Sequence, residues 1–272
     1  MSGGGAIPQP LFVRSFGQGP RRALALHCTI AHSGAWRGLA AQMDSELTLV
    51  TPDMLSHGRS PDWDRQGDFP DRMFEAVEPL LEPGMDVIGH SFGATVALRL
   101  AASFPERVRS LTLLEPVMFC VAIADAPGTI ASHDAEIRPV FEALDAGDDA
   151  LGARLFNRMW GDTGGPRWDQ MPEQMRAAMV RGIHVLPASV SATNEDRPGI
   201  LRPGVLDRLT MPVAILRGGA SHPSMVPICD GLAARIAGAR NIVVDGAGHM
   251  LPVTRPEDAA AHLRALLAAS PG

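Results

Sequence analysis

The 272 residues are enough to bury a sizeable core, and 46% hydrophobic with 20% charged residues is an ordinary balance for a globular enzyme. The net charge of −6 argues against nucleic acid and anionic membrane surfaces as partners, because both attract basic proteins. Three widely spaced cysteines predict neither a disulfide framework nor a zinc ribbon. Residues 1–8 lack a basic stretch followed by an apolar one, and no run reaches transmembrane length, so we expect a cytoplasmic protein.

The N-terminal part of the chain alternates short apolar strands with helices. Strands are predicted over residues 11–16, 23–27 and 47–53, and helices over residues 36–43 and 71–81. Strands that are apolar throughout, with helices between them, indicate a parallel sheet buried on both faces. We therefore expect an α/β fold with a mostly parallel sheet covered by helices on both faces.

A serine follows the next predicted strand directly. Residues 85–88 form a short apolar run, and residues 94–102 have the apolar face of a helix. Between them, Gly89-His90-Ser91-Phe92-Gly93 reads Gly-x-Ser-x-Gly, in which glycines tolerate the close contacts and unusual dihedral angles of a sharp turn. Such a turn exposes the hydroxyl in front of a helix N-terminus, so the motif predicts a nucleophile. The alternative is a glycine-rich turn with no chemical role.

The alternation lapses after the strand predicted at residues 110–114. Helical patterns appear at residues 136–146, 151–160 and 172–180, separated by loops rich in Gly, Asp and Pro. We interpret residues 118–205 as a mostly helical cap, a lid inserted into the α/β core.

The strand–helix alternation then resumes. Strands are predicted over residues 213–218 and 241–244, with helices over residues 225–237 and 256–268. The last strand leads into a glycine-flanked loop that carries His249. The predicted core therefore consists of two segments, residues 1–117 and 206–272.

Four features together resemble the α/β-hydrolase superfamily. They are the Ser91 turn, the strand ending at His27, Asp53 followed by Gly58-Arg59-Ser60, and the loop Gly246-Ala247-Gly248-His249. The resemblance covers both halves of the predicted core and implies the α/β-hydrolase fold. Within the superfamily, the chain is similar to the small, capped, single-domain branch of serine esterases and dehalogenases. Because this fold serves many reactions, the resemblance is weak for substrate.

The resemblance also implies residue roles. Ser91 would be the nucleophile and His249 its general base, since a serine hydroxyl needs a base within hydrogen-bond reach. The oxyanion hole would use the backbone N–H groups of Phe92 and Thr29. The family usually has glycine where this chain has Cys28, which can narrow the site or shift its backbone. Nothing in the sequence places a base beside Cys28, so we interpret it as a small buried residue.

The acid of the expected triad departs from the family pattern. The usual aspartate position falls on Ser221, which cannot carry a negative charge against an imidazolium. Some branches place the acid after the preceding core strand, where this chain has Glu115. A carboxylate ending a buried strand needs a partner, and a histidine N–H is a suitable one, so we predict Glu115 as the acid. Asp245 and a Ser–His dyad without an acid are the alternatives.

We expect acyl transfer with no cofactor, because the sequence shows neither a metal-ligand cluster nor a phosphate-binding loop. A small to medium hydrophobic ester or lactone is the expected small-molecule substrate. Apolar residues of the cap and of the loops near the serine are candidates for the substrate pocket: Ile30, Met118, Phe119, Met159, Trp160 and Met250, with Met171, Met175 and Met179 as further cap residues. Methionines at helical spacing are nevertheless more often core residues than ligand contacts.

Other functions remain open at this stage. A carbon–carbon bond hydrolase or a cofactor-free perhydrolase could use the same triad, whereas a dehalogenase or an epoxide hydrolase of this fold needs a carboxylate where Ser91 stands. A non-catalytic ligand-binding homologue is the alternative outside the enzymes. The sequence does not indicate an oligomeric state.

Overall fold

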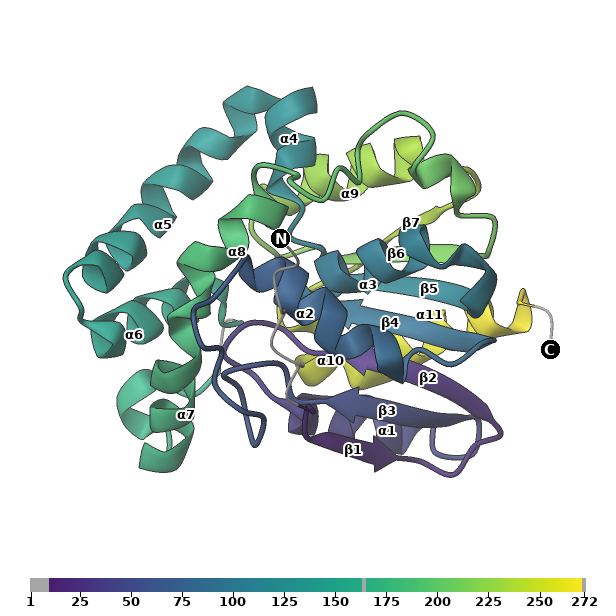
Figure 1. Cartoon of the computed structure of the whole chain (residues 1–272), viewed down its shortest axis with the longest axis horizontal. Helices are drawn as coiled ribbons and strands as arrows, with labels where there is room; N and C mark the ends of the chain where they lie inside the picture. Colours follow the sequence, from purple (N-terminus) through teal and green to yellow (C-terminus); the bar gives the residue numbers. More distant parts are fainter. Residues whose placement is uncertain (1–9, 163–164, 271–272) are drawn as a thin grey trace, which may run out of the picture.

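The computed structural model describes residues 10–162 and 165–270, which form a seven-stranded sheet (Figure 1). The strand order is β1-β3-β2-β4-β5-β6-β7, and only β1 runs antiparallel to its neighbour. The strands are β1 (Val13–Phe16), β2 (Arg21–Leu26), β3 (Leu47–Pro52), β4 (Met85–His90), β5 (Val108–Leu114), β6 (Val213–Gly218) and β7 (Arg240–Val244). The fold is therefore the α/β class with the mostly parallel sheet that the sequence predicted.

Helices cover both faces of the sheet (Figure 1). One core cluster joins α2 (Phe69–Val77), α3 (Phe92–Ser103) and α9 (Met225–Arg235) to one face. A second cluster joins α1 (Arg37–Gln42) and α11 (Pro256–Ala268) to the other. Burial on both faces explains why the central strands are apolar throughout rather than alternating.

Five α-helices lie between β5 and β6 in the described part of the chain. They are α4 (Phe119–Asp125), α5 (Ile130–Asp145), α6 (Asp149–Trp160), α7 (Glu173–Ile183) and α8 (Val185–Thr193). Helices α5 to α8 stand beyond the carboxyl ends of the parallel strands, whereas α4 packs against α9 (Figure 1). The sequence did not predict α4, which is short, or α8, whose proline and β-branched residues have low helix propensity. None of the described helices combines the length and apolar character needed to span a bilayer.

Polar contacts hold two of the helices α5 to α8, called the cap helices below, against the segment between β3 and α2. Arg181 of α7 donates to the Gly58 carbonyl over 2.9 Å and to Asp62 over 2.8 Å. The Ser191 hydroxyl of α8 donates to Asp68 over 2.7 Å. These bonds fix α7 and α8 above the sheet edge where the predicted site residues lie.

Candidate active site

Ser91 occupies a strained turn between β4 and α3. Its backbone has φ 56° and ψ −121°, a conformation that costs free energy for any residue with a side chain. A Cβ at Gly89 would run into the Ala94 backbone, and one at Gly93 into the carbonyl of Leu26. The two glycines are therefore what lets the strand and helix approach closely enough to form this turn.

His249 links Ser91 to Glu115. The His249 side chain comes from the loop between β7 and α10 (Leu251–Thr254). Its Nε2 lies 3.0 Å from Ser91 Oγ, and its Nδ1 lies 2.9 Å from Glu115 Oε2. An ionised carboxylate can only accept, so Nδ1 carries the proton and Nε2 is left to accept from the serine hydroxyl. The three side chains are buried and form one hydrogen-bonded chain.

The Glu115 carboxylate is fully buried and has three donors. Its Oε1 accepts from the Gly218 N–H over 2.5 Å, and its Oε2 accepts from Ser221 Oγ over 2.6 Å as well as from His249. Donors of this kind offset the cost of removing a carboxylate from water. Asp245, the alternative acid, is exposed, and no described contact joins it to His249.

Two buried histidines support the loops around the site. His27 Nε2 accepts from the Met54 N–H over 2.9 Å, and His57 Nε2 accepts from the Ile30 N–H over 3.0 Å. The Nδ1 atom of each ring hydrogen-bonds a backbone carbonyl over 2.8 Å. Burial lowers the pKa of His27 to about 4 and the pKa of His57 to about 3. Both rings are therefore neutral, and each hydrogen-bonds the backbone of neighbouring loops.

The residues expected to supply the oxyanion-hole N–H groups are Phe92 and Thr29. Phe92 is the first residue of α3, so its N–H has no intrahelical acceptor, and the Thr29 N–H donates to no other described residue. Both residues border the same cavity as Ser91. The neighbouring Cys28 is buried, and burial raises the pKa of its thiol to about 12, which removes the thiolate that a nucleophile would need.

Comparison with known proteins decides the family. The model of the "Alpha/beta hydrolase family" matches residues 23–262, which is most of the chain. The chain belongs to this family.

Relatives of this alpha/beta hydrolase include proteins of similar length. It is 30% identical over 273 residues to "Lipase LipV" of Mycobacterium tuberculosis, and the alignment covers 94% of this chain and 97% of that protein. It is 26% identical over 247 residues to "Pimeloyl-[acyl-carrier protein] methyl ester esterase" of Nitrosomonas europaea, over 91% of this chain and 95% of that one. An alpha/beta hydrolase structure from Sphaerobacter thermophilus superposes with a TM-score of 0.70 at 20% identity, over 94% of this chain and 96% of that chain, and shows the same fold.

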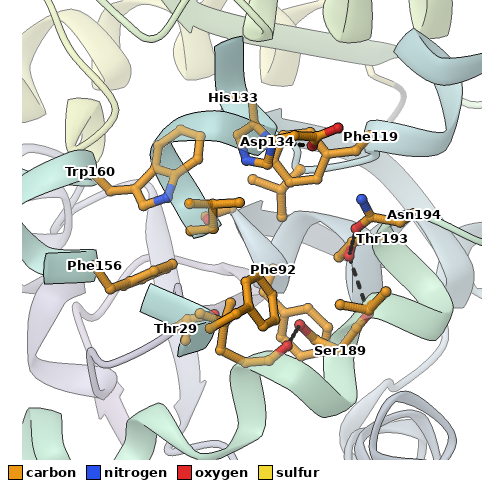
Figure 2. Close-up of a pocket in the computed structure, with 16 residues that line it drawn as sticks. Thr29, Phe92, Phe119, His133, Asp134, Phe156, Trp160, Ser189, Thr193 and Asn194 are labelled. Atoms are coloured by element: carbon orange, nitrogen blue, oxygen red, sulfur yellow. Dashed lines mark hydrogen bonds and ion pairs between the residues drawn. The ribbon is translucent and has the colours of Figure 1, made fainter. Parts of the chain in front are cut away.

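Two cavities of this alpha/beta hydrolase meet at Ser91. A cavity of 310 Å³ lies between the serine and the cap helices α5, α6 and α8, and a larger cavity of 680 Å³ lies toward α7. Both open to solvent; the smaller one, which is slightly more covered, is called the enclosed cavity below and the larger one the open cavity. Thr29, Phe156 and Trp160 border both. Figure 2 shows the enclosed cavity, with Phe156 and Trp160 of α6 along one side. The serine is therefore reached from two directions under the cap.

Four of the six residues predicted for the substrate pocket lie at these cavities. Phe119 borders the enclosed cavity, and Ile30 and Met250 border the open one. Trp160 borders both, and its ring centroid lies 4.5 Å from that of His249. The Trp160 side chain thus covers the imidazole from the cap side.

Met118 and Met159 border neither cavity in the described structure. Met118 is buried in the core cluster, and Met159 packs against that cluster with its side chain partly exposed. Met159 directly precedes Trp160 on α6, and because successive helical residues point about 100° apart, its side chain lies on a different face of the helix from that of Trp160. Of the other methionines that the sequence suggested, Met175 and Met179 border the open cavity, whereas Met171 is buried elsewhere.

Asp162 was not identified from the sequence and lies at the loop that carries His249. Its Oδ1 accepts from the Met250 N–H over 2.9 Å, and its Oδ2 accepts from Thr254 Oγ1 over 2.5 Å. A Cβ at Gly248 would collide with this carboxylate. A single aspartate after a helical patch carries no sequence signal of its own, because the contact depends on how α6 packs against a loop 88 residues later.

Proposed function

We propose that this alpha/beta hydrolase is a serine hydrolase that cleaves a carboxylic ester or lactone of a small to medium hydrophobic substrate through an acyl-enzyme. The observation that carries the proposal is the buried hydrogen-bonded chain from Ser91 through His249 to Glu115, placed where two cavities meet. The relatives named as a lipase and an esterase support an ester hydrolase.

Each residue has a role that follows from its position. Ser91 Oγ attacks the substrate carbonyl while His249 Nε2, 3.0 Å away, takes its proton. Glu115 holds the imidazole in the productive tautomer and stabilises the imidazolium that forms. The tetrahedral oxyanion is stabilised by the N–H groups of Thr29 and Phe92, which in this position contribute several kcal/mol, about 3 for each donor.

The second half of the reaction reverses the proton movements. The imidazolium of His249 gives its proton to the leaving alcohol, and His249 then activates the water that hydrolyses the acyl-Ser91 ester. Trp160 covers the imidazole ring at 4.5 Å and keeps bulk water from that side. Exclusion of water strengthens the interactions of the charged intermediate with the protein.

Hydrolysis of p-nitrophenyl butanoate by the purified protein tests the proposal. We expect a burst of p-nitrophenol as the acyl-enzyme forms, and covalent labelling of Ser91 by a fluorophosphonate, located by peptide mass spectrometry. Ser91→Ala removes both and lowers kcat by roughly ten-thousand-fold or more. The matched control is Ser132→Ala, which changes an exposed serine on α5 and leaves rate and labelling intact.

A panel of substrates separates the proposal from its alternatives. Turnover of a vinylogous diketone in preference to every ester and lactone contradicts ester hydrolysis in favour of carbon–carbon cleavage. Peroxide-dependent formation of a peracid, faster than hydrolysis of the same acyl group, points to a perhydrolase. A folded protein that neither turns over nor becomes labelled at Ser91 is a binding homologue.

A further inference from the structure

The position of His249 indicates which of the two cavities at Ser91 receives the leaving alcohol. It borders the open cavity, and it is not among the described residues that border the enclosed one. On the proposed function, His249 Nε2 protonates the oxygen of the leaving alcohol, which must therefore lie within hydrogen-bond reach of that atom. The alcohol then belongs in the open cavity. The acyl group then belongs in the enclosed cavity, which is bordered by Ser91 and by the proposed oxyanion donors Thr29 and Phe92.

The size of the enclosed cavity limits the acyl group. Its volume is 310 Å³. At the ~30 Å³ that a water molecule occupies, this space holds roughly ten heavy atoms. Its walls include apolar side chains such as Val117, Ile137 and Leu186. A chain of medium length fills this space, whereas the end of a long fatty acyl chain would extend beyond the apolar walls.

Polar side chains border the part of the enclosed cavity remote from the serine turn. In Figure 2, Thr29 and Phe92 lie at the lower end of the cavity, Asp134 at the upper end and Asn194 on the right, with its amide nitrogen directed toward the upper end. Thr193 Oγ1 donates to Asn194 Oδ1 over 2.7 Å. The amide N–H groups of Asn194 donate to no other described residue. Asp134 is exposed, and its Oδ1 lies 3.2 Å from His133 Nδ1, which leaves its other carboxylate oxygen without a described partner. Asn194 and Asp134 thus supply a hydrogen-bond donor and an acceptor at the border of this cavity.

The charges of the two cavities are opposite. Asp134 is the charged residue of the enclosed cavity, and no lysine or arginine is among its described wall residues. Arg59 borders the open cavity, whose described wall residues include no aspartate or glutamate. A carboxylate at the far end of the acyl chain would therefore meet a like charge and no cation. A hydroxyl or amide can donate to Asp134 and accept from Asn194.

We propose that the enclosed cavity is the acyl site and that it selects a medium-length acyl chain whose far end carries an uncharged hydrogen-bonding group, a hydroxyl or a carboxamide. This inference rests on the proposed function and assigns the substrate class of the same site.

A series of p-nitrophenyl esters from acetyl to dodecanoyl tests the size limit. We expect kcat/KM to peak near hexanoyl and to fall for the longest chains. Ile137→Trp fills the enclosed cavity and should lower kcat/KM for the hexanoyl ester relative to the acetyl ester by roughly tenfold or more. Arg138→Trp, an exposed change one residue along α5, should leave that ratio unchanged. A flat profile, or an Ile137→Trp effect that is equal for all acyl lengths, overturns the size assignment.

Three esters of equal chain length test the far end, namely hexanoyl, ω-hydroxyhexanoyl and adipoyl. We expect the hydroxyl ester to have the highest kcat/KM and the adipoyl ester, which ends in a carboxylate, the lowest. Asn194→Leu, which is nearly isosteric, should abolish the preference for the hydroxyl. Asp134→Asn should reduce the discrimination against adipoyl by roughly fivefold, because an exposed pair of like charges is partly screened. A wild-type preference for adipoyl overturns the proposal.

Acetyl esters of alcohols from ethanol to octanol separate this inference from the proposed function. If Ile137→Trp changes selectivity among alcohols but not among acyl groups, the two cavities are assigned the wrong way round. Labelling of Ser91 with turnover of p-nitrophenyl acetate, but without the acyl preferences, supports the hydrolase and refutes the substrate class. Absence of both labelling and turnover refutes the hydrolase itself.

Discussion

Ser221 donates a 2.6 Å hydrogen bond to Glu115. Among the described residues, Glu115 has the only buried carboxylate that contacts His249. The position that holds an aspartate in much of the family thus supports a carboxylate that reaches His249 from the neighbouring strand. Glu115 leaves β5 with φ 52°, an unusual backbone conformation that turns its side chain toward the loop after β6. On the proposed function, the two residues together take the place of that aspartate.

On the proposed function, Glu115→Gln should lower kcat by roughly a thousand- to ten-thousand-fold while the protein stays folded. The glutamine amide cannot hold the imidazole in the required tautomer or stabilise the imidazolium, which is the kind of loss known for triad acids. Steady-state kinetics with p-nitrophenyl butanoate measures the effect, and circular dichroism checks the fold. Activity within a few fold of the wild type would remove Glu115 from the mechanism.

Ser221→Asp offers a rescue of that variant. In the wild-type background it places a second carboxylate against Glu115, so we expect lower activity from like-charge repulsion. In the Glu115→Gln background the new carboxylate takes the usual family position, and part of the lost kcat should return. Ser221→Ala in the same background is the matched control, because it removes the hydroxyl without adding charge. No gain of Ser221→Asp over Ser221→Ala would show that position 221 cannot serve His249.

The features that the sequence predicted are those with a local backbone signature. Gly89 and Gly93 mark the Ser91 turn because a Cβ at either position collides with neighbouring backbone, and apolar runs mark strands that are buried on both faces. Glu115 was expected from the resemblance to branches of the family that place the acid after the preceding core strand, because the usual aspartate position holds Ser221. Its geometry toward His249 is as expected, and its catalytic role stays a prediction.

Features that depend on packing between distant segments could not be predicted. Met159 shares the apolar periodicity of α6 with the cavity residues Phe156 and Trp160, and only the rotation of the helix decides which side chain faces the serine. Met118 directly precedes α4, and only the packing of this segment into the core decides that its side chain is buried there. The contact of Asp162 with the His249 loop likewise arises from the docking of α6. Single residues of this kind leave no pattern in the chain.

The buried histidines predict that the protein loses stability in mild acid. Burial lowers the pKa of His27 to about 4, and that of His57 and His90 to about 3, from the ordinary value of 6.5. Below pH 6.5 the unfolded chain binds protons that the folded chain does not, so the free energy of unfolding falls as pH falls toward 4. Each such histidine contributes about 1.4 kcal/mol per pH unit at its steepest, or about 4 for the three.

Urea unfolding at pH values from 7.5 to 4.5 measures this slope. His57→Gln keeps an acceptor for the Ile30 N–H and a donor for the carbonyl of Leu55, but removes the titrating group. It should reduce the slope by about 1.4 kcal/mol per pH unit. Ser132→Ala, which removes no titratable group, should keep the wild-type slope. A stability that is constant from pH 7 to pH 4.5 would contradict the neutral state of these rings.

The contacts of Asp162 with the loop that carries His249 predict that a change at the end of α6 lowers the rate of reaction. Asp162→Ala removes the two hydrogen bonds that hold Met250 and Thr254 beside His249, so the imidazole should lose its fixed position. We expect kcat to fall by roughly tenfold or more with a smaller change in KM, since small misplacements of a catalytic group are costly. Asp169→Asn, an exposed change in the segment after α6, is the control.

Gly248→Ala tests the same contact from the opposite side. In the wild type the added Cβ collides with the Asp162 carboxylate and should displace the His249 loop, lowering kcat. In the Asp162→Ala background the obstacle is gone, so the same substitution should cost much less. The difference between the two costs is the coupling between the residues, which a double-mutant cycle on kcat measures. Strictly additive effects would show that Asp162 does not position the loop that carries His249.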